Sequence, residues 1–156
     1  MAMHTWFECK IRYEKTMENG MQKKVTEPYL VDALSFTEAE ARIIEEMTPF
    51  ITGEFTVSDI KRANYSELFP SDEESADRWF KCKLIFITLD EKSGAEKKTS
   101  TQVLVQAADL RDAVKKLDEG MKGTMADYQI GMVSETPLMD VYPYSAEPND
   151  KPEFDP

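Results

Sequence analysis

The chain has 156 residues, of which 41% are hydrophobic and 31% charged, a balance typical of a folded globular protein rather than a disordered or fibrous one. No apolar run approaches the roughly 20 residues that a bilayer requires, so we expect no membrane segment. Two cysteines and one histidine are too few for a structural zinc site or a disulfide framework, and we expect no metal and no cofactor. The first residues show no basic region leading into an apolar stretch, and we therefore expect a cytoplasmic location.

The net charge of −11 is unevenly distributed along the chain. Residues 71–77 contain four acidic residues and no basic one, and residues 145–156 contain four acidic residues and one lysine. Most of the excess negative charge therefore belongs to two short segments. The rest of the chain carries a net charge of −4, is only mildly acidic and leaves room for a local basic surface.

The first predicted elements are two strands joined by a turn. Apolar residues alternate with polar ones over 6–15, which places Phe7, Cys9, Ile11 and Tyr13 on one face of a strand. Asn19-Gly20 is typical of a two-residue hairpin turn, because both residues tolerate a positive φ. We expect the return strand over 23–32.

A helix and two further strands follow. Ser35 with Glu38 has the spacing of a capping box, and Thr37 with Glu40 is a competing N-terminus two residues later. The next apolar residues recur at helical spacing and predict one stripe that faces the sheet. Residues 53–61 then predict a third strand, and the segment that ends at Phe69-Pro70 a short fourth one.

The same pattern recurs in the second half of the chain. Trp6-Phe7-Glu8-Cys9-Lys10 returns 73 residues later as Trp79-Phe80-Lys81-Cys82-Lys83, and a Ser93-Gly94 turn, a helix capped by Asp109 and strands at 125–134 and up to Tyr142-Pro143 follow in the same order. We therefore predict an α+β fold of two pseudo-symmetric ββαββ repeats, with antiparallel sheets and one helix packed on each. The predicted boundaries are 5–70 for repeat 1, 71–77 for an acidic linker and 78–144 for repeat 2, the two repeats forming one compact unit, with 145–156 as a flexible acidic tail.

No catalytic motif is visible in the sequence. His4 lies at the start of the chain, where a general base would lack fixed neighbours. Cys9 and Cys82 occupy equivalent inward strand positions, and we interpret them as small buried hydrophobic residues rather than as a disulfide. The acidic residues of 71–77 lack the alternating ligand spacing of a cation site. We therefore expect a protein that is not an enzyme and has no catalytic residues.

A binding face is the chemistry that remains. Aromatic rings interleaved with cations on a sheet are typical of single-strand binding, because bases stack on rings and phosphates pair with cations. The candidate residues for such a face are Trp6, Lys10, Arg12, Lys23, Lys24, Trp79, Lys81, Lys83, Lys97 and Lys98. The alternative is that the tryptophans cap the edge of the core and that the lysines protect sheet edges.

The C-terminal segment offers a second candidate contact. Phe154 and Asp155 combine a single aromatic residue with neighbouring acids, which resembles the acidic tips of single-stranded DNA-binding proteins. Such tips occupy the protein's own basic groove or recruit a protein partner. A disordered, solubilising tail is the alternative.

Two resemblances extend this interpretation. Trp6-Phe7-Glu8-Cys9-Lys10 together with residues 29–41 resembles an uncharacterised family of short bacterial and phage proteins, a domain of unknown function that brings no activity with it. The order of strands and helix from Gly53 to Met121 is similar to the unit of the PUR and Whirly single-strand-binding proteins. That likeness concerns the fold and implies single-strand binding only by analogy.

The function expected from the sequence is non-catalytic binding of single-stranded nucleic acid through an aromatic and basic sheet face. The alternative is a protein-interaction or oligomerisation module, which would include a homo-oligomer, with an enzyme as a third possibility. A basic surface that passes both tryptophans would favour the first.

Overall fold

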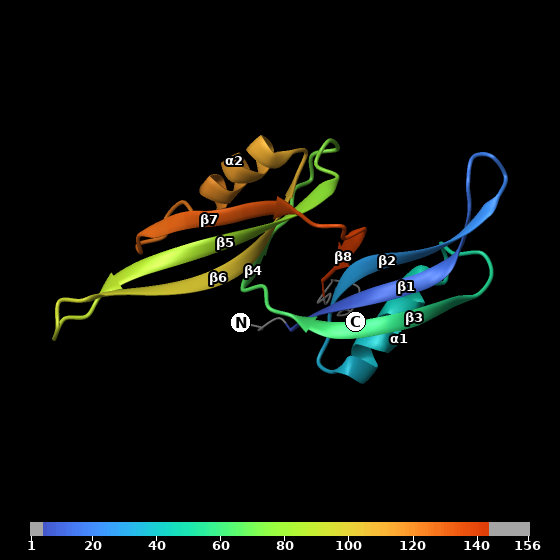
Figure 1. Cartoon of the computed structure of the whole chain (residues 1–156), viewed down its shortest axis with the longest axis horizontal. Helices are drawn as coiled ribbons and strands as arrows, with labels where there is room; N and C mark the ends of the chain where they lie inside the picture. Colours follow the sequence, from blue (N-terminus) through green and yellow to red (C-terminus); the bar gives the residue numbers. More distant parts are fainter. Residues whose placement is uncertain (1–4, 144–156) are drawn as a thin grey trace, which may run out of the picture. The chain divides into compact units, whose positions relative to one another are not determined.

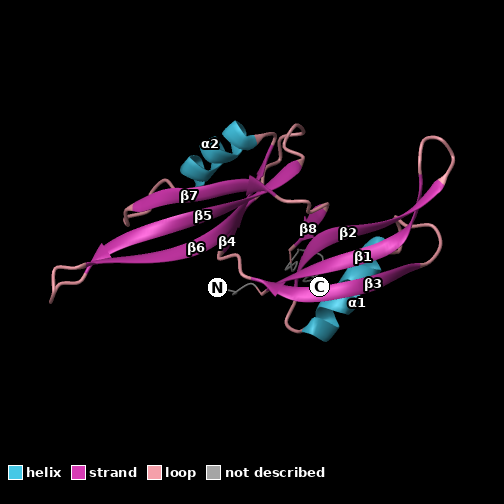
Figure 2. Ribbon diagram, in the orientation of Figure 1, coloured by secondary structure: helices cyan, strands magenta, loops and turns pink. Residues whose placement is uncertain are grey.

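The computed structural model of the chain describes residues 5–143. His4, the predicted tail at 145–156 and its residues Phe154 and Asp155 lie outside the described residues. Within them the fold is α+β and consists mostly of strands, as predicted (Figure 2). Across residues 5–143, neither helix has the length and apolar character needed to span a bilayer.

The elements follow the order ββαββ twice in the described part of the chain. Their bounds are β1 (Trp6–Thr16), β2 (Gln22–Asp32), α1 (Phe36–Met47), β3 (Phe55–Ala63), β4 (Glu67–Phe69), β5 (Arg78–Leu89), β6 (Glu96–Ala107), α2 (Leu110–Gly120), β7 (Tyr128–Glu135) and β8 (Asp140–Tyr142). Two compact units contain them: unit 1 is Met1–Ala63 with Leu138–Pro156, and unit 2 is Asn64–Pro137.

Unit 1 contains a four-stranded sheet in the order β3-β1-β2-β8 with α1 against one face (Figure 1). β1 pairs antiparallel with β2 and β3, whereas β8 pairs parallel with β2. The predicted inward residues Phe7, Cys9 and Ile11 pack with Ala39 and Ile43 of the helix and form the core of this unit.

Unit 2 has the corresponding arrangement, with the strand order β4-β6-β5-β7 and α2 against one face (Figure 1). β5 pairs antiparallel with β6 and β7, and β4 pairs parallel with β6. Phe80, Cys82 and Leu84 of β5 pack with Ala113 and Leu117 of α2 in a separate core.

The short fourth strands are where the structure departs from the boundaries drawn on the sequence. β4 belongs to the segment 5–70, yet it lies in the sheet of unit 2; β8 belongs to 78–144, yet it completes the sheet of unit 1. Each pairs over only three residues, near the C-terminal end of the neighbouring strand that precedes the helix. The outer strands of the two units are therefore exchanged between the two halves of the chain.

The ends of the helices follow the predicted capping residues. Ser35 rather than Thr37 is the N-cap of α1, and its hydroxyl accepts a hydrogen bond from the backbone N–H of Glu38 at 3.1 Å. Asp109 caps α2 in the same way, accepting from the N–H of Asp112 at 2.8 Å. These bonds satisfy donors that have no partner within the helix.

The hairpin turns are longer than predicted. The first loop comprises the five residues between Thr16 and Gln22, and not a two-residue turn centred on Asn19-Gly20. Gly20 has a φ of +83°, and the side chain of Asn19 accepts a hydrogen bond from the N–H of Met21 at 3.0 Å. The two residues thus serve as turn formers within a wider loop.

Candidate nucleic-acid interface

Each sheet has a helix-free face, and the strand register decides which candidate residues lie on it. Side chains alternate between the two faces of a strand, and directly paired residues share a face. In β1 the residues after Trp6 that share its face are Glu8, Lys10, Arg12 and Glu14, opposite to the core residues. In β5 the corresponding face carries Trp79, Lys81, Lys83, Ile85 and Ile87.

The two tryptophans are buried. Trp6 is 3% exposed and Trp79 is 6% exposed, and neither belongs to the core under a helix. A ring stacks on a nucleobase only if its face is accessible. The proposal of Trp6 and Trp79 as an exposed stacking platform is therefore wrong.

Acidic neighbours balance the cations on the helix-free face of unit 1. Lys10 pairs with Asp59 of β3, and Glu14 pairs with Lys24 of β2. Arg12 lies between these pairs, beside threonines of both neighbouring strands. The face combines opposite charges at short spacing, so it presents no continuous positive surface.

A hollow of about 720 Å³ lies at the hairpin end of this sheet and brings two of the candidate cations together. Arg12 and Lys24 both line it, and hydroxyl and amide groups of Thr16, Gln22 and Thr56 add hydrogen-bonding capacity. Glu14 and Glu54 also line it, so its formal charge is zero. The hollow offers polar contacts without a net attraction for anions.

The helix-free face of unit 2 has a different composition. Lys81 and Lys83 lie two residues apart on the central strand β5, and Lys98 lies on β6 opposite Ile87. Their neighbours on the same face are uncharged residues of β6 and β7: Ser100, Gln102, Leu104, Gln129, Met132 and Ser134. Among the described residues of this face the acidic ones lie toward the far end: Glu96, and Asp127 just before β7, whose carbonyl accepts a hydrogen bond from the N–H of Ile87.

A β-bulge gives this face part of its shape. The register between β5 and β7 shifts between Lys83 and Leu84, where Gly131 is the extra residue. A Cβ at Gly131 would lie 2.8 Å from Cδ1 of Ile85, so the isoleucine side chain packs directly on the glycine. A bulge commonly reorients side chains near functional surfaces.

The remaining two candidate lysines lie on the other side of the sheets. Lys23 pairs with Lys15, and Lys97 pairs with Thr88, in rows that continue the helix-covered faces. Consecutive residues of a strand point to opposite faces, so each Lys-Lys pair is divided between the two faces. The proposal that both residues of each pair serve one binding surface is therefore wrong for Lys23 and Lys97.

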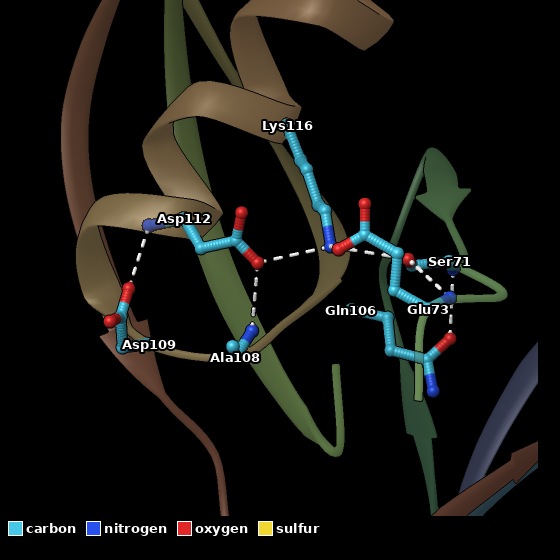
Figure 3. A network of polar contacts seen from close by, with 7 residues as sticks. All are labelled: Ser71, Glu73, Gln106, Ala108, Asp109, Asp112 and Lys116. Carbon is cyan, nitrogen blue, oxygen red and sulfur yellow. Dashed lines mark hydrogen bonds and ion pairs between the residues drawn. The ribbon is translucent and has the colours of Figure 1, made fainter. Parts of the chain in front are cut away.

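A polar network that the sequence analysis missed surrounds Lys116 of α2 (Figure 3). Its ammonium lies 3.0 Å from Oδ2 of Asp112, 2.9 Å from Oε1 of Glu73 and 3.1 Å from Oγ of Ser71. The N–H of Ser71 also donates to the side chain of Gln106 at 2.9 Å. These contacts fix the start of the predicted acidic linker against α2, and the i,i+4 spacing of Asp112 and Lys116 was the only sequence signal for them.

The charges of this network shift its pKa values. Hydrogen bonds from the N–H of Ala108 and from Lys116 hold the pKa of Asp112 below its usual range. Partial burial acts to lower the pKa of Lys116, but its hydrogen bonds to Glu73 and Asp112 outweigh that effect and raise the pKa. Both groups are therefore charged at neutral pH and stabilise each other.

A second polar cluster in unit 1 surrounds Glu27. Its carboxylate accepts hydrogen bonds from the hydroxyls of Tyr13 at 2.9 Å and Tyr29 at 3.3 Å, and Lys15 lies 3.5 Å away. Burial, with the hydrogen bond to Glu27 next, raises the pKa of Tyr13 to about 12, and burial also raises the pKa of Tyr29. The hydroxyls therefore act as donors across the ordinary pH range and not as bases.

The two cysteines lie in the cores of the two units. Cys9 and Cys82 are free and buried, and burial raises their pKa values to about 12 and about 11. A protonated thiol is a poor nucleophile. Among residues 5–143, no three His, Cys, Asp or Glu side chains are grouped so that they could hold a metal ion.

The comparisons with known proteins place the chain in a family. The model of a domain of unknown function, DUF4494, matches residues 5–144. The chain belongs to this family. No curated protein and no solved structure matches it.

The DUF4494 match extends over every described element. It includes both sheets, both helices and the segment that joins β4 to β5. The two units and their exchanged outer strands together therefore make up the DUF4494 domain. Its description assigns no activity, so the function must be inferred from surfaces such as the helix-free face of unit 2.

Proposed function

We propose that this protein is a non-catalytic binding protein for single-stranded nucleic acid, and that the helix-free face of unit 2 is the contact surface. The observation that supports this most directly is the composition of that face. Lys81, Lys83 and Lys98 lie there among uncharged polar and apolar side chains, and the acidic residues that the structure describes on this face lie at its far end. The corresponding face of unit 1 has no such excess of positive charge.

The chemistry of the face suits an extended strand. Lysines pair with phosphates irrespective of sequence, which provides most of the affinity and makes it sensitive to salt. The amides of Gln102 and Gln129 can hydrogen-bond to base edges, and Ile85 with Met132 offers apolar surface to unstacked bases. Without an accessible aromatic ring, we expect weaker binding than in proteins that stack bases on tryptophan.

We further propose that the two halves of the chain are pseudo-symmetric ββαββ repeats. The identical strand orders of the two sheets and the equivalent positions of Trp6 and Trp79 support this. We also propose that the chain is similar in fold to PUR and Whirly proteins, that it occurs in bacteria and phages and that it is located in the cytoplasm. A protein partner for Phe154 and Asp155 is also part of this proposal.

The test is binding of a fluorescently labelled oligonucleotide, measured by anisotropy, because buried tryptophans are poor reporters. Reversing two charges with Lys81→Glu and Lys83→Glu should weaken binding at least tenfold at low salt, because it removes two phosphate contacts. Each lost contact should also reduce the slope of log affinity against log salt concentration by about 0.7. The matched control is Lys23→Glu with Lys97→Glu, which changes the net charge equally on the other faces.

Equal weakening by both variant pairs would show that only net charge matters, and would contradict a site on unit 2. No binding by the unmodified protein at low salt would contradict the proposed function itself. Retained binding in the control and its loss in the Lys81 and Lys83 variant would support it.

A protein-interaction module is the second candidate. Phe36 and Ile44 are eight residues apart on α1 and are 50% and 41% exposed, and Leu34 and Phe50 beside the helix are also exposed. Exposed apolar side chains mark a protein contact when they form a contiguous patch, which remains to be tested for these four. Light scattering of the chain and of a Phe36→Ser, Ile44→Ser variant tests this: a monomer in both cases, with no partner recovered by the unmodified chain, contradicts it.

A further inference from the structure

Within the described residues, β8 is held in unit 1 only by non-covalent contacts, since the polypeptide that leads into it comes from unit 2. β4 differs in this respect. The polypeptide after β4 continues through the segment anchored by Lys116 directly into β5 of the same sheet. β8 can therefore detach from its sheet without displacing the rest of that unit, whereas β4 is tied to its sheet through β5.

The contacts of β8 are short and well defined. Its residues pair with Tyr29, Leu30 and Val31 of β2, and the N–H of Met139 donates to the carbonyl of Pro28 at 2.9 Å. The ring of Tyr142 stacks on that of Tyr29 at 6.2 Å between centroids. A side-chain N–H of Arg42 donates to the carbonyl of Pro143 at 3.2 Å. We call residues 28–31 with Arg42 the β8 seat.

The connector that brings β8 to this seat is short. The N–H and the hydroxyl of Thr136 both donate to the carbonyl of Trp79 at 2.9 Å, which fixes Thr136 to unit 2. Only Pro137 and Leu138 separate it from Met139, which is bonded to unit 1. Short hinges favour exchange of an element between copies, because a hinge that cannot fold back readily can extend instead.

We propose that the β8 seat accepts β8 from a second copy of this chain, which produces a strand-exchanged dimer. Every contact of β8 is retained in the exchange. The equilibrium between monomer and dimer therefore depends on the effective concentration of β8 near the β8 seat of its own chain, which the connector sets. For short connectors the effective concentration is on the order of millimolar, and the dimer should form when the protein refolds at a concentration near this value. This inference does not depend on nucleic-acid binding.

The experiment uses two full-length single variants, Leu30→Cys and Val141→Cys, whose residues are direct partners in the β2–β8 ladder. They are mixed, unfolded under reducing conditions, refolded together at roughly 1 mM or at roughly 5 µM and then oxidised; these values lie near and far below the local concentration. We expect a covalent dimer of the two variants on a non-reducing gel after concentrated refolding, and at least tenfold less after dilute refolding.

The native thiols and a second cysteine pair provide the controls. Cys9 and Cys82 are buried and remain protonated, so they do not compete for oxidation. Thr16→Cys and Gln22→Cys are exposed partners across the β1–β2 hairpin, which stays within one chain in the proposed dimer. Mixing those two variants should give no covalent dimer.

A double variant with both Leu30→Cys and Val141→Cys tests the geometry within one chain. If it forms its internal disulfide while the mixed single variants stay unlinked at 1 mM, the proposal is overturned. Sedimentation of the unmodified chain after concentrated refolding gives an independent answer if the cysteine variants fail to fold: a dimer supports the exchange, and a monomer alone contradicts it.

Discussion

The guanidinium of Arg42 donates a hydrogen bond to the carbonyl oxygen of Pro143, a residue 101 positions later in the chain, at 3.2 Å. Lys116 occupies the corresponding place on α2 and donates to the hydroxyl of Ser71 at 3.1 Å. Each helix thus extends one cation to the chain that leaves the neighbouring fourth strand. These contacts hold the two short strands in sheets to which the preceding strand of the chain does not belong.

Lys116 should contribute measurably to stability. Lys116→Met keeps the aliphatic part of the side chain but removes its contacts with Ser71, Glu73 and Asp112, and we expect the free energy of unfolding to fall by about 1–2 kcal/mol. Urea unfolding measures this. Lys115→Met removes the same charge from an exposed neighbouring position and should change the free energy by less than about 0.5 kcal/mol. Equal effects of the two substitutions would rule out a specific role.

Tyr13 should make the protein sensitive to alkali. Its pKa rises from 10 to about 12 in the folded state, so its contribution to stability is complete below pH 10 and is lost as the pH rises from 10 to 12. Urea unfolding between pH 9 and pH 12 should show a smaller decline in Tyr13→Phe than in the unmodified protein. Tyr29, Tyr142 and Cys9 contribute declines to both curves, so only the difference reports on Tyr13. Two parallel curves would refute the prediction.

Gly120, the last residue of α2, should not tolerate alanine. A Cβ there would lie 2.8 Å from Cδ1 and Cε1 of Phe69, whose ring packs on the core of unit 2. Gly120→Ala would otherwise favour a helix, but displacement of the ring should lower the free energy of unfolding by about 1–2 kcal/mol. In a Phe69→Leu background the same change should be neutral or stabilising. A loss that is the same in both backgrounds would show that Phe69 is not the cause.

Cutting the chain between its halves should leave the molecule assembled. A protease site inserted between Glu74 and Ser75 would separate β1–β4 from β5–β8, yet each sheet contains strands from both fragments. We expect the fragments to elute together by size-exclusion chromatography and to separate only in denaturant. Separate elution in buffer would show that β4 and β8 do not hold the fragments together. An inserted site that is left uncut is the control for the insertion.

The local features of the fold could be predicted because they depend on neighbouring residues. The alternation of Phe7, Cys9 and Ile11 places these side chains on one face in any sheet that buries half of its surface. Ser35 and Asp109 terminate their helices because a short polar side chain can accept from a free N–H three residues later. These choices involve only a few residues close in the chain.

The candidate site was less predictable from the sequence, because the pairing register of the strands decides which side chains share a face of the sheet. Lys97 and Lys98 look alike in the sequence, but pairing with Thr88 and Ile87 places them on opposite sides of the sheet. Trp6 and Trp79 are buried in the folded chain, and their position at the start of a strand does not reveal this. The absence of acids around Lys81 and Lys83 follows from the neighbours that β6 and β7 provide.

The sequence by itself determines the order of strands and helices, the inward residues and the helix caps, because these features depend on short-range periodicity and capping chemistry. The sheet that each short fourth strand joins was decided only by the tertiary structure. A strand of three residues such as Glu67–Phe69 has too little pattern to specify a partner, and contacts with residues far away in the chain, such as those of Lys116, make the choice.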